Sequence, residues 1–366
     1  MLDRFDFNNN DMELLLLQDF SNNKRCKRSK VGSYVENTIS SYGGSDFQSH
    51  FRLNRSSAEN LLNLIYPALS KKDAAAGREP VSVEKTMLMS LWVLATNVSF
   101  RDVADRFGLA KGNAHNKFMQ FISAVQYLGS RYISFPEGNN ATRAVNKFET
   151  LRPNKPFPGV IGCIDGTHIP IPAPKCNKAS YYNRKGFYSI LLQVVCDADM
   201  KFTDIFCGWP GSTNDARMWK RSPLYEKLKS DEQFRANDYH LLGDCAYKVE
   251  TFILSPYKDN GHLTQKQKRF NYRLSCIRVI VEQAIGLLKN RFRRLKCLDM
   301  SKVDAMGKVI YVACILHNFC IELGDELPGE SIDPDTVDIV LEEGNDRPSN
   351  EGTAKRDAIA DIFMSE

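Results

Sequence analysis

The sequence predicts an α+β fold in which a mixed sheet flanked by helices is preceded by an all-helical segment. Apolar residues recur at helical spacing over residues 48–135. From Gly159 onward, apolar runs of strand length alternate with helical patterns. The 366 residues, of which 43% are hydrophobic, are enough for about two domains with buried cores.

Residues 1–47 mix Asn, Ser, Gly and charged residues without sustained periodicity, so we expect a disordered N-terminal arm. The basic run KRCKRSK at 24–30 is typical of a nuclear import signal or of phosphate contacts, although a solvated linker fits equally well. The chain has no uncharged apolar run of 18 residues, and its start lacks the basic lead of a signal peptide. We therefore expect neither secretion nor membrane insertion.

Residues 48–135 contain a segment with the form of a helix-turn-helix. Ser99 is expected to cap a helix that ends at Arg106, and the turn Phe107-Gly108-Leu109 precedes a second helix from Lys111 to Val125. In such motifs the start of the second helix meets phosphates and base edges of DNA. The candidate DNA-binding residues here are Lys111, Asn113, His115 and Lys117. A plain helical hairpin with a solvated polar face is the alternative.

Residues 136–322 begin with a loop rich in Pro and Asn and then follow an α+β order. The predicted elements are strands at 159–169, 189–197, 201–207 and 239–244, a short strand at 252–254, and helices at 215–228, 264–294 and 302–323. The turn DADMK between the second and third strands fits a β-hairpin. Three antiparallel strands followed by helix, strand and helices match the ribonuclease H-like architecture.

Four acidic residues occupy unusual positions in this region. Asp165 ends an apolar strand whose Ile161 and Cys163 are expected on the same face, and Asp244 ends a second apolar strand beside the first. Two carboxylates at neighbouring strand ends repel each other unless they share a proton or a cation. The simplest cation is Mg²⁺, or Mn²⁺ in its place.

The other two acids leave alternatives open. Glu282 lies on a basic helix with Arg278 and Lys289 on the same stripe, so it is either a metal ligand or the partner of a helix salt bridge to Arg278. Asp215 follows Gly-Ser-Thr-Asn and could instead cap the helix that starts there. Strand order favours Asp244 over Asp215 as the middle member of a catalytic set.

Cationic residues surround these acids in the sequence, in a density that suits a nucleic-acid backbone. The candidate DNA-binding residues of this region are Arg184, Lys185, Arg278, Lys289 and Arg293. The net charge of +5 is uneven, because residues 322–366 hold 14 Asp and Glu against three Lys and Arg. A basic body of net +16 with an acidic tail at 323–366 suggests a polyanionic partner, and the alternative for the tail is a solvated, disordered end.

The cysteines indicate small apolar packing residues in a reducing compartment. The ten cysteines are scattered without a Cys-X-X-Cys pair. Cys314, His317 and Cys320 are the one tempting metal cluster, but their spacing favours a buried core helix.

Six motifs in this order resemble the PIF/Harbinger-type DDE transposases and the nucleases domesticated from them, over about residues 50–322. They are IDGTHIPI, YYNRKGFYSI, GWPGSTNDARMW, LLGDCAY, VEQAIGLLKNRF and ILHNFC. The resemblance implies a ribonuclease H-like domain that uses divalent metal to hydrolyse phosphodiester bonds at transposon ends and to join them to target DNA. The family's acidic motif positions correspond to Asp165, Asp215, Asp244 and Glu282.

The resemblance also implies a nuclear protein that works with a separate Myb-like DNA-binding partner. A homodimer is left open. The alternative function is that of a domesticated DNA-binding or scaffold protein that retains the fold without turnover.

Overall fold

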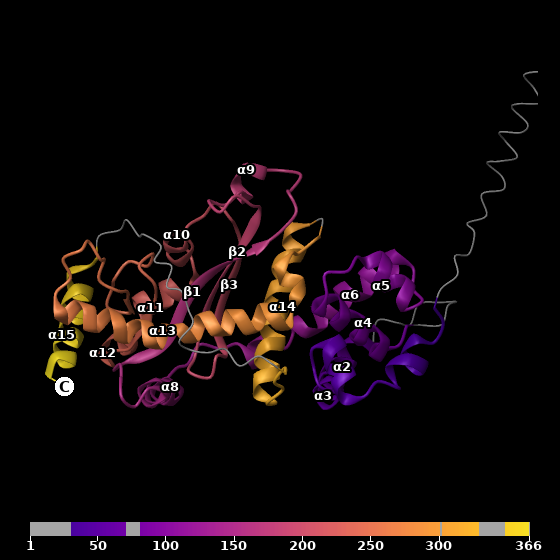
Figure 1. Ribbon diagram of the computed structural model, residues 1–366, viewed down its shortest axis with the longest axis horizontal. Coiled ribbons are helices and arrows are strands. Elements are labelled where there is room, and N and C mark those ends of the chain that lie inside the picture. The colour runs from indigo at the N-terminus through magenta and orange to yellow at the C-terminus, as the bar shows by residue number, and fades with distance from the viewer. Residues whose placement is uncertain (1–30, 71–80, 301, 329–347, 366) are drawn as a thin grey trace, which may run out of the picture.

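The computed structural model describes residues 31–70, 81–300, 302–328 and 348–365, and its elements follow an α+β order (Figure 1). The basic run at 24–30 therefore lies outside the described residues. The helices that precede the sheet are η1 (Tyr34–Ile39), α2 (Gly44–Phe51), α3 (Arg55–Ser70), α4 (Val83–Ala95), α5 (Phe100–Arg106), α6 (Lys111–Gln126), α7 (Gly129–Tyr132) and α8 (Asn139–Leu151).

The strands confirm the predicted positions to within a few residues. They are β1 (Val160–Pro170), β2 (Ser189–Cys196), β3 (Phe202–Pro210), β4 (His240–Leu242) and β5 (Ile253–Leu254). The remaining helices are α9 (Lys178–Tyr181), α10 (Asp215–Trp219), α11 (Pro223–Ser230), α12 (Glu232–Ala236), α13 (Gln265–Arg291), η2 (Arg293–Lys296), α14 (Val303–Glu322) and α15 (Asn350–Ser365).

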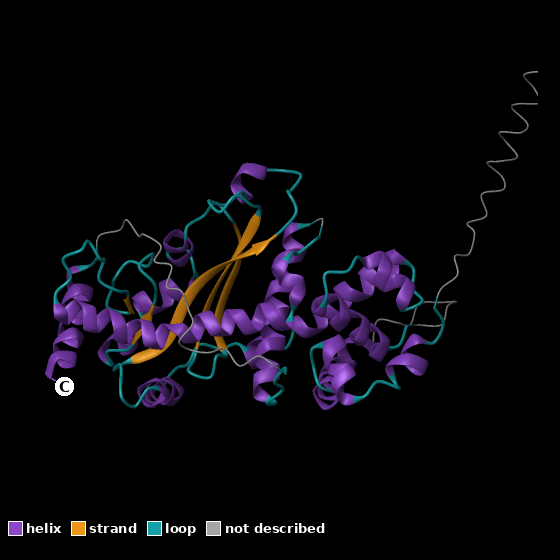
Figure 2. Cartoon of the chain, in the orientation of Figure 1, coloured by secondary structure: helices purple, strands orange, loops and turns teal. Residues whose placement is uncertain are grey.

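The strands form one mixed sheet, drawn in orange in Figure 2, with the order β3-β2-β1-β4-β5. The first three strands are antiparallel, whereas β4 pairs in parallel with β1 and with β5. The predicted hairpin between β2 and β3 is present, and the Asp197 carboxylate closes it by accepting hydrogen bonds from the backbone N–H groups of Asp199 and Lys201, both at 2.9 Å. This mixed sheet flanked by helices is consistent with a ribonuclease H-like domain.

Helices cover both faces of the sheet. Helix α13 crosses β1 and β2 (Figure 1), and its Ile277 and Val281 share one hydrophobic cluster with Cys163. Helices α8, α11 and α12 form a second cluster with Ile161 and Ile164. Ile161 and Cys163 therefore pack in different clusters, contrary to our expectation of one face. A register shift in the pairing of β1 with β4, between Val160 and Gly162, interrupts the alternation.

Two predictions in this region were wrong in detail. The loop expected at 136–158 contains helix α8, which buries Ala141, Val145 and Phe148 at helical spacing. The helix expected at 215–228 is two helices, because Ser222 caps α11 and Pro223 occupies its first turn, where proline starts a helix and cannot continue one.

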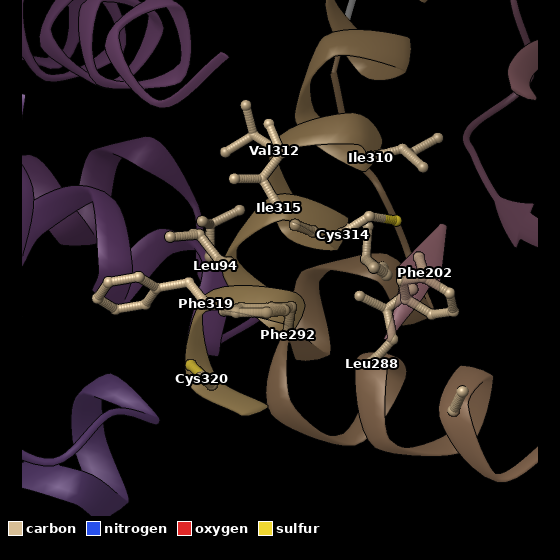
Figure 3. Packing of buried hydrophobic residues seen from close by; sticks show 14 of the residues in the cluster. Leu94, Phe202, Leu288, Phe292, Ile310, Val312, Cys314, Ile315, Phe319 and Cys320 are labelled. Carbon is tan, nitrogen blue, oxygen red and sulfur yellow. The ribbon is translucent and has the colours of Figure 1, made fainter. Parts of the chain in front are cut away.

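The N-terminal helices share one hydrophobic core with the sheet region. Figure 3 shows Leu94 of α4 beside Phe319 of α14 and Phe292, which follows α13. Helices α6 and α7 also pack against α14. Part of the arm expected to be disordered belongs to this core, since Tyr34, Val35 and Ile39 of η1 are buried.

The predicted helix-turn-helix segment has the expected backbone form. The Ser99 hydroxyl caps α5, and Gly108 takes φ +68° in the turn, where a side chain would be strained. The Leu109 N–H donates to the Ala104 carbonyl at 2.8 Å, a capping bond that ends α5.

Helix α14 is a core helix, as predicted for the segment with Cys314, His317 and Cys320. All three side chains are buried, and His317 stacks on Phe202 at 4.5 Å while its Nε2 contacts the Met200 carbonyl at 2.9 Å. Burial lowers the pKa of His317 to about 4, so the ring is neutral at pH 7. Among the described residues, α14 is the one helix apolar and long enough to cross a membrane, but a buried core helix has the same composition.

The end of the predicted acidic tail is folded. Helix α15 packs against α13 and β5, where Phe363 is buried and meets the Phe157 ring edge to face, with ring centroids 5.2 Å apart. Two arginines cover aromatic rings at this contact: Arg356 lies 3.9 Å from the Tyr257 ring and Arg273 lies 4.3 Å from the Phe363 ring. The many charged residues of 350–365 therefore did not indicate the helix that this segment forms.

Candidate active site

The four acids singled out in the sequence line one cavity of about 530 Å³. They come from four different elements: Asp165 from β1, Asp215 from the start of α10, Asp244 from the segment after β4, and Glu282 from the middle of α13. The sheet and two helices therefore bring together residues that are far apart in the chain.

Parallel pairing of β1 and β4 explains how Asp165 and Asp244 meet. The last paired positions are Cys163 and Leu242, so each aspartate lies two residues beyond the pairing, at the same end of the sheet. Asp244 is only 6% exposed, and its carboxylate accepts a hydrogen bond from the Ala246 N–H at 3.0 Å. That bond holds the carboxylate in a turn at the strand end.

The structure separates the two roles that the sequence left open for Asp215. The side chain of Asn214, not that of Asp215, caps α10 by accepting from the Arg217 N–H at 2.9 Å. The Asp215 carboxylate instead lies so close to Gly166 that a Cβ on Gly166 would collide with it. Asp215 therefore faces the strand that carries Asp165.

Glu282 forms the predicted salt bridge to Arg278, one turn earlier on α13. The guanidinium of Arg278 also lies 3.7 Å from the Asp165 carboxylate. Burial raises the pKa of Glu282, and the charge and hydrogen bond of Arg278 oppose that increase. Arg278 is buried and paired with acids, so these ion pairs occupy its guanidinium, and its expected contact with DNA stays a prediction.

Two polar residues near the acids, Tyr247 and Gln193, were not identified from the sequence. Tyr247 is buried, and its hydroxyl accepts a hydrogen bond from Gln193 Nε2 at 3.1 Å. Burial and the charges of Asp215, Asp165 and Asp244 raise the pKa of Tyr247 well above its usual value, so the phenol stays protonated. The only sequence signal for Tyr247 was its position three residues after Asp244.

Cationic side chains line the other part of the cavity, namely Lys185, Lys289 and Lys296. Lys289 Nζ donates to Thr167 Oγ1 at 2.6 Å and to the His168 carbonyl at 3.1 Å. Burial and the nearby charge of Lys185 lower the pKa of Lys289 to about 8, so most of it is charged at pH 7. Acids and lysines thus face the same space.

His168 also lines this cavity, and its Nδ1 lies 2.9 Å from Ser189 Oγ. This contact joins β1 to β2 at the edge of the cavity.

The acids have the right chemistry for a divalent ion. Carboxylate oxygens are the ligands that Mg²⁺ and Mn²⁺ prefer, and four of them border the same cavity. Within the described part of the chain, no three His, Cys, Asp or Glu side chains lie close enough together to hold a metal ion as they stand. The cation between Asp165 and Glu282 is the guanidinium of Arg278.

The remaining candidates for DNA contact lie outside this cavity. Lys111, Asn113 and His115 are exposed on α6, at the end of the molecule formed by the N-terminal helices (Figure 1). Lys117 is only 8% exposed, because it falls on the buried side of α6, so it does not share the exposed surface of the other three. Arg184 and Arg293 are exposed and do not line the cavity.

Replacing Gly166 by alanine tests the close approach of Asp215. The added methyl group would collide with the Asp215 carboxylate, so we expect a loss of about 1–3 kcal/mol in the free energy of unfolding, measured by urea denaturation. Gly112→Ala is the control, since nothing lies within 4 Å of its Cβ and it is exposed on a helix. That variant should gain roughly 0.5–1 kcal/mol. Equal stability of Gly166→Ala and the wild type would contradict the contact.

Comparison with known proteins identifies the same region. Residues 164–318 match the family described as DDE superfamily endonuclease, and this range includes all four acids. No solved structure matches the chain.

Curated relatives extend the similarity beyond that range. The chain is 26% identical to Protein ALP1-like of Arabidopsis thaliana, over 78% of this chain and 74% of the relative. It is 28% identical to HARBI1 of Rattus norvegicus, a protein provisionally named a nuclease, over 72% and 74% of the two chains. It is also 26% identical to the Arabidopsis thaliana protein Antagonist of Like Heterochromatin Protein 1, over 68% and 64%.

Proposed function

Since this chain belongs to the DDE endonuclease superfamily and is related to Harbinger transposase-derived proteins, we propose that it is a divalent-metal-dependent DNA nuclease. Its substrate would be the phosphodiester bond at transposon ends, with strand transfer to target DNA as a further step. The observation that carries the proposal is the meeting of four carboxylates with three lysines in one cavity.

The acids would hold the metal, and the lysines would hold the DNA. Superfamily members typically use divalent ions, and ions bound by Asp165, Asp215, Asp244 and Glu282 would activate water and stabilise the leaving oxygen. Lys185 is exposed and borders the cavity, so its ammonium can bind a backbone phosphate beside the acids. In the reaction, a water oxygen bonds to phosphorus, a bridging P–O bond breaks, and the leaving oxygen takes up a proton.

We propose further that the protein is nuclear, that it works with a Myb-like DNA-binding partner protein, and that it forms a homodimer. The basic charge of residues 1–321 supports a DNA partner. The exposed start of α6, with Lys111, Asn113 and His115, offers a second DNA contact away from the cavity.

A DNA-binding protein without turnover is the second candidate. The observation that favours it is the guanidinium of Arg278 between Asp165 and Glu282. In this case the acids would serve the stability of the fold, and the protein would bind DNA without cutting it.

A cleavage assay decides between the two functions. Purified protein is incubated with supercoiled plasmid and with a linear duplex, in Mg²⁺, in Mn²⁺ and in excess EDTA, and nicked products are separated on a gel. The nuclease proposal requires cleavage in either metal and none in EDTA. Protein that binds DNA but never nicks it in either metal would show the second function instead.

The contribution of α6 to DNA binding can be measured from salt dependence. Lys111→Ala should reduce the slope of log affinity against log salt by about 1, because one phosphate contact is lost. Lys117→Ala is the matched control on the same helix, since Lys117 is only 8% exposed and lies on the buried side of α6. An unchanged slope for Lys111→Ala, measured by fluorescence anisotropy, would remove α6 from the DNA interface.

A further inference from the structure

The guanidinium of Arg278 lies between two acids that come from different elements. Nη1 is 3.7 Å from Asp165 Oδ1 on β1, and Nη2 contacts Glu282 Oε1 on α13. The arginine is only 7% exposed, so its charge is largely removed from water. A buried charge of this kind is costly unless carboxylates surround it.

The charges around Arg278 balance that cost. Burial by itself acts to lower its pKa, but Asp165, Glu282 and Asp244 outweigh the effect and raise the pKa. Lys289 lies on the same helix but donates to Thr167 and to the His168 backbone. Arg278 is therefore the side chain that joins Asp165 to Glu282 by ion pairs.

We propose that Arg278 is a positioning residue that holds Asp165 and Glu282 in the metal-free protein and competes with a divalent cation for them. This inference rests on the proposed function, because it assigns a second cation to the same carboxylates. It explains why the four acids line one cavity although, among the described residues, no three of them are close enough together to bind one metal ion.

The competition follows from electrostatics and from the position of the pair on the helix. A carboxylate oxygen that is paired with the guanidinium has to give up that contact to bind a metal ion, and two cations on the same acids repel each other. Arg278 and Glu282 are four residues apart on α13, so their pair can open by side-chain rotation without movement of the helix. The cost of opening it lowers the affinity of the site for metal.

Direct metal binding in the absence of DNA tests this inference. Arg278→Gln removes the competing charge, so we expect it to bind Mn²⁺ at least about tenfold more tightly than the wild type, measured by isothermal titration calorimetry. In thermal unfolding without metal, Arg278→Gln should have a lower midpoint than the wild type. Saturating Mn²⁺ should then raise the midpoint of Arg278→Gln by more than it raises that of the wild type. Arg278→Lys keeps the positive charge, so its affinity for Mn²⁺ should fall between those of the wild type and Arg278→Gln.

Arg273→Gln is the matched control for loss of a buried arginine. Arg273 lies on the same helix and is buried, but it donates to the Pro156 carbonyl and covers the Phe363 ring instead of the acids. It should lose stability without any change in Mn²⁺ affinity. A change in affinity as large as that of Arg278→Gln would show a general effect of altered folding and overturn the proposal.

The outcomes separate this inference from the proposed function. Equal or weaker Mn²⁺ binding by folded Arg278→Gln would overturn the competition and leave the nuclease proposal to the cleavage assay. Mn²⁺ binding by none of the proteins would overturn both. If Arg278→Gln does not fold without metal, Mn²⁺ added during refolding should recover folded protein, and failure to recover it would also overturn the competition.

Discussion

Replacement of Asp165 by asparagine is expected to reduce metal-dependent DNA cleavage at least about 100-fold, because the loss of one carboxylate ligand removes several kcal/mol of transition-state stabilisation. DNA affinity should stay nearly unchanged, since a carboxylate repels phosphate and the lysines of the cavity remain. Single-turnover cleavage of a labelled duplex and fluorescence anisotropy in EDTA measure the two quantities separately.

Asp204→Asn is the control for this variant. Asp204 lies on β3 of the same sheet but outside the cavity, and burial raises its pKa to about 6, so an amide of the same shape replaces a carboxylate whose charge burial disfavours. Its cleavage rate should match that of the wild type. Full activity in Asp165→Asn, or equal losses in both variants, would argue against a metal ligand at Asp165.

The second large effect is expected from Asp325→Ala, which should reduce the free energy of unfolding by about 3–5 kcal/mol. The Asp325 carboxylate is buried and receives hydrogen bonds from the Asn54 N–H at 2.8 Å, from Gln48 Nε2 at 3.2 Å and from Arg291 Nη1 at 3.4 Å. Its loss leaves the buried Arg291 without this carboxylate and also breaks contacts to the N-terminal helices. Urea denaturation measures the change.

Glu326→Ala provides the neighbouring control, because that side chain is exposed and Gln48 contacts only the Glu326 backbone carbonyl. It should change stability by no more than about 0.5 kcal/mol. Similar losses of unfolding free energy in the two variants would show that the hydrogen bonds of the Asp325 carboxylate do not stabilise the fold. A separate early transition in Asp325→Ala would show that the N-terminal helices unfold on their own.

The strands were predictable because each is an apolar run between turn residues, and the hairpin at Asp197 has a local sequence cause. Helix α8 was missed because the Pro and Asn residues around it suggested a loop, although its apolar residues recur at helical spacing. Helix α15 was missed because its helical pattern is weak beside charged residues. Each is stabilised by packing on a distant surface, α8 on β1 and α15 on α13. Local sequence carries little information about such partners.

The sequence by itself singled out four candidate acids. Asp165, Asp244 and Glu282 interrupt an apolar or basic context at a cost in stability, whereas Asp215 was chosen mainly from the family resemblance. It did not determine their arrangement. Only the tertiary structure placed Asp215 against Gly166 and gave the capping role to Asn214. Only the packing of α13 on β1 placed Arg278 between Asp165 and Glu282, because a contact across 113 residues depends on how helix and strand meet.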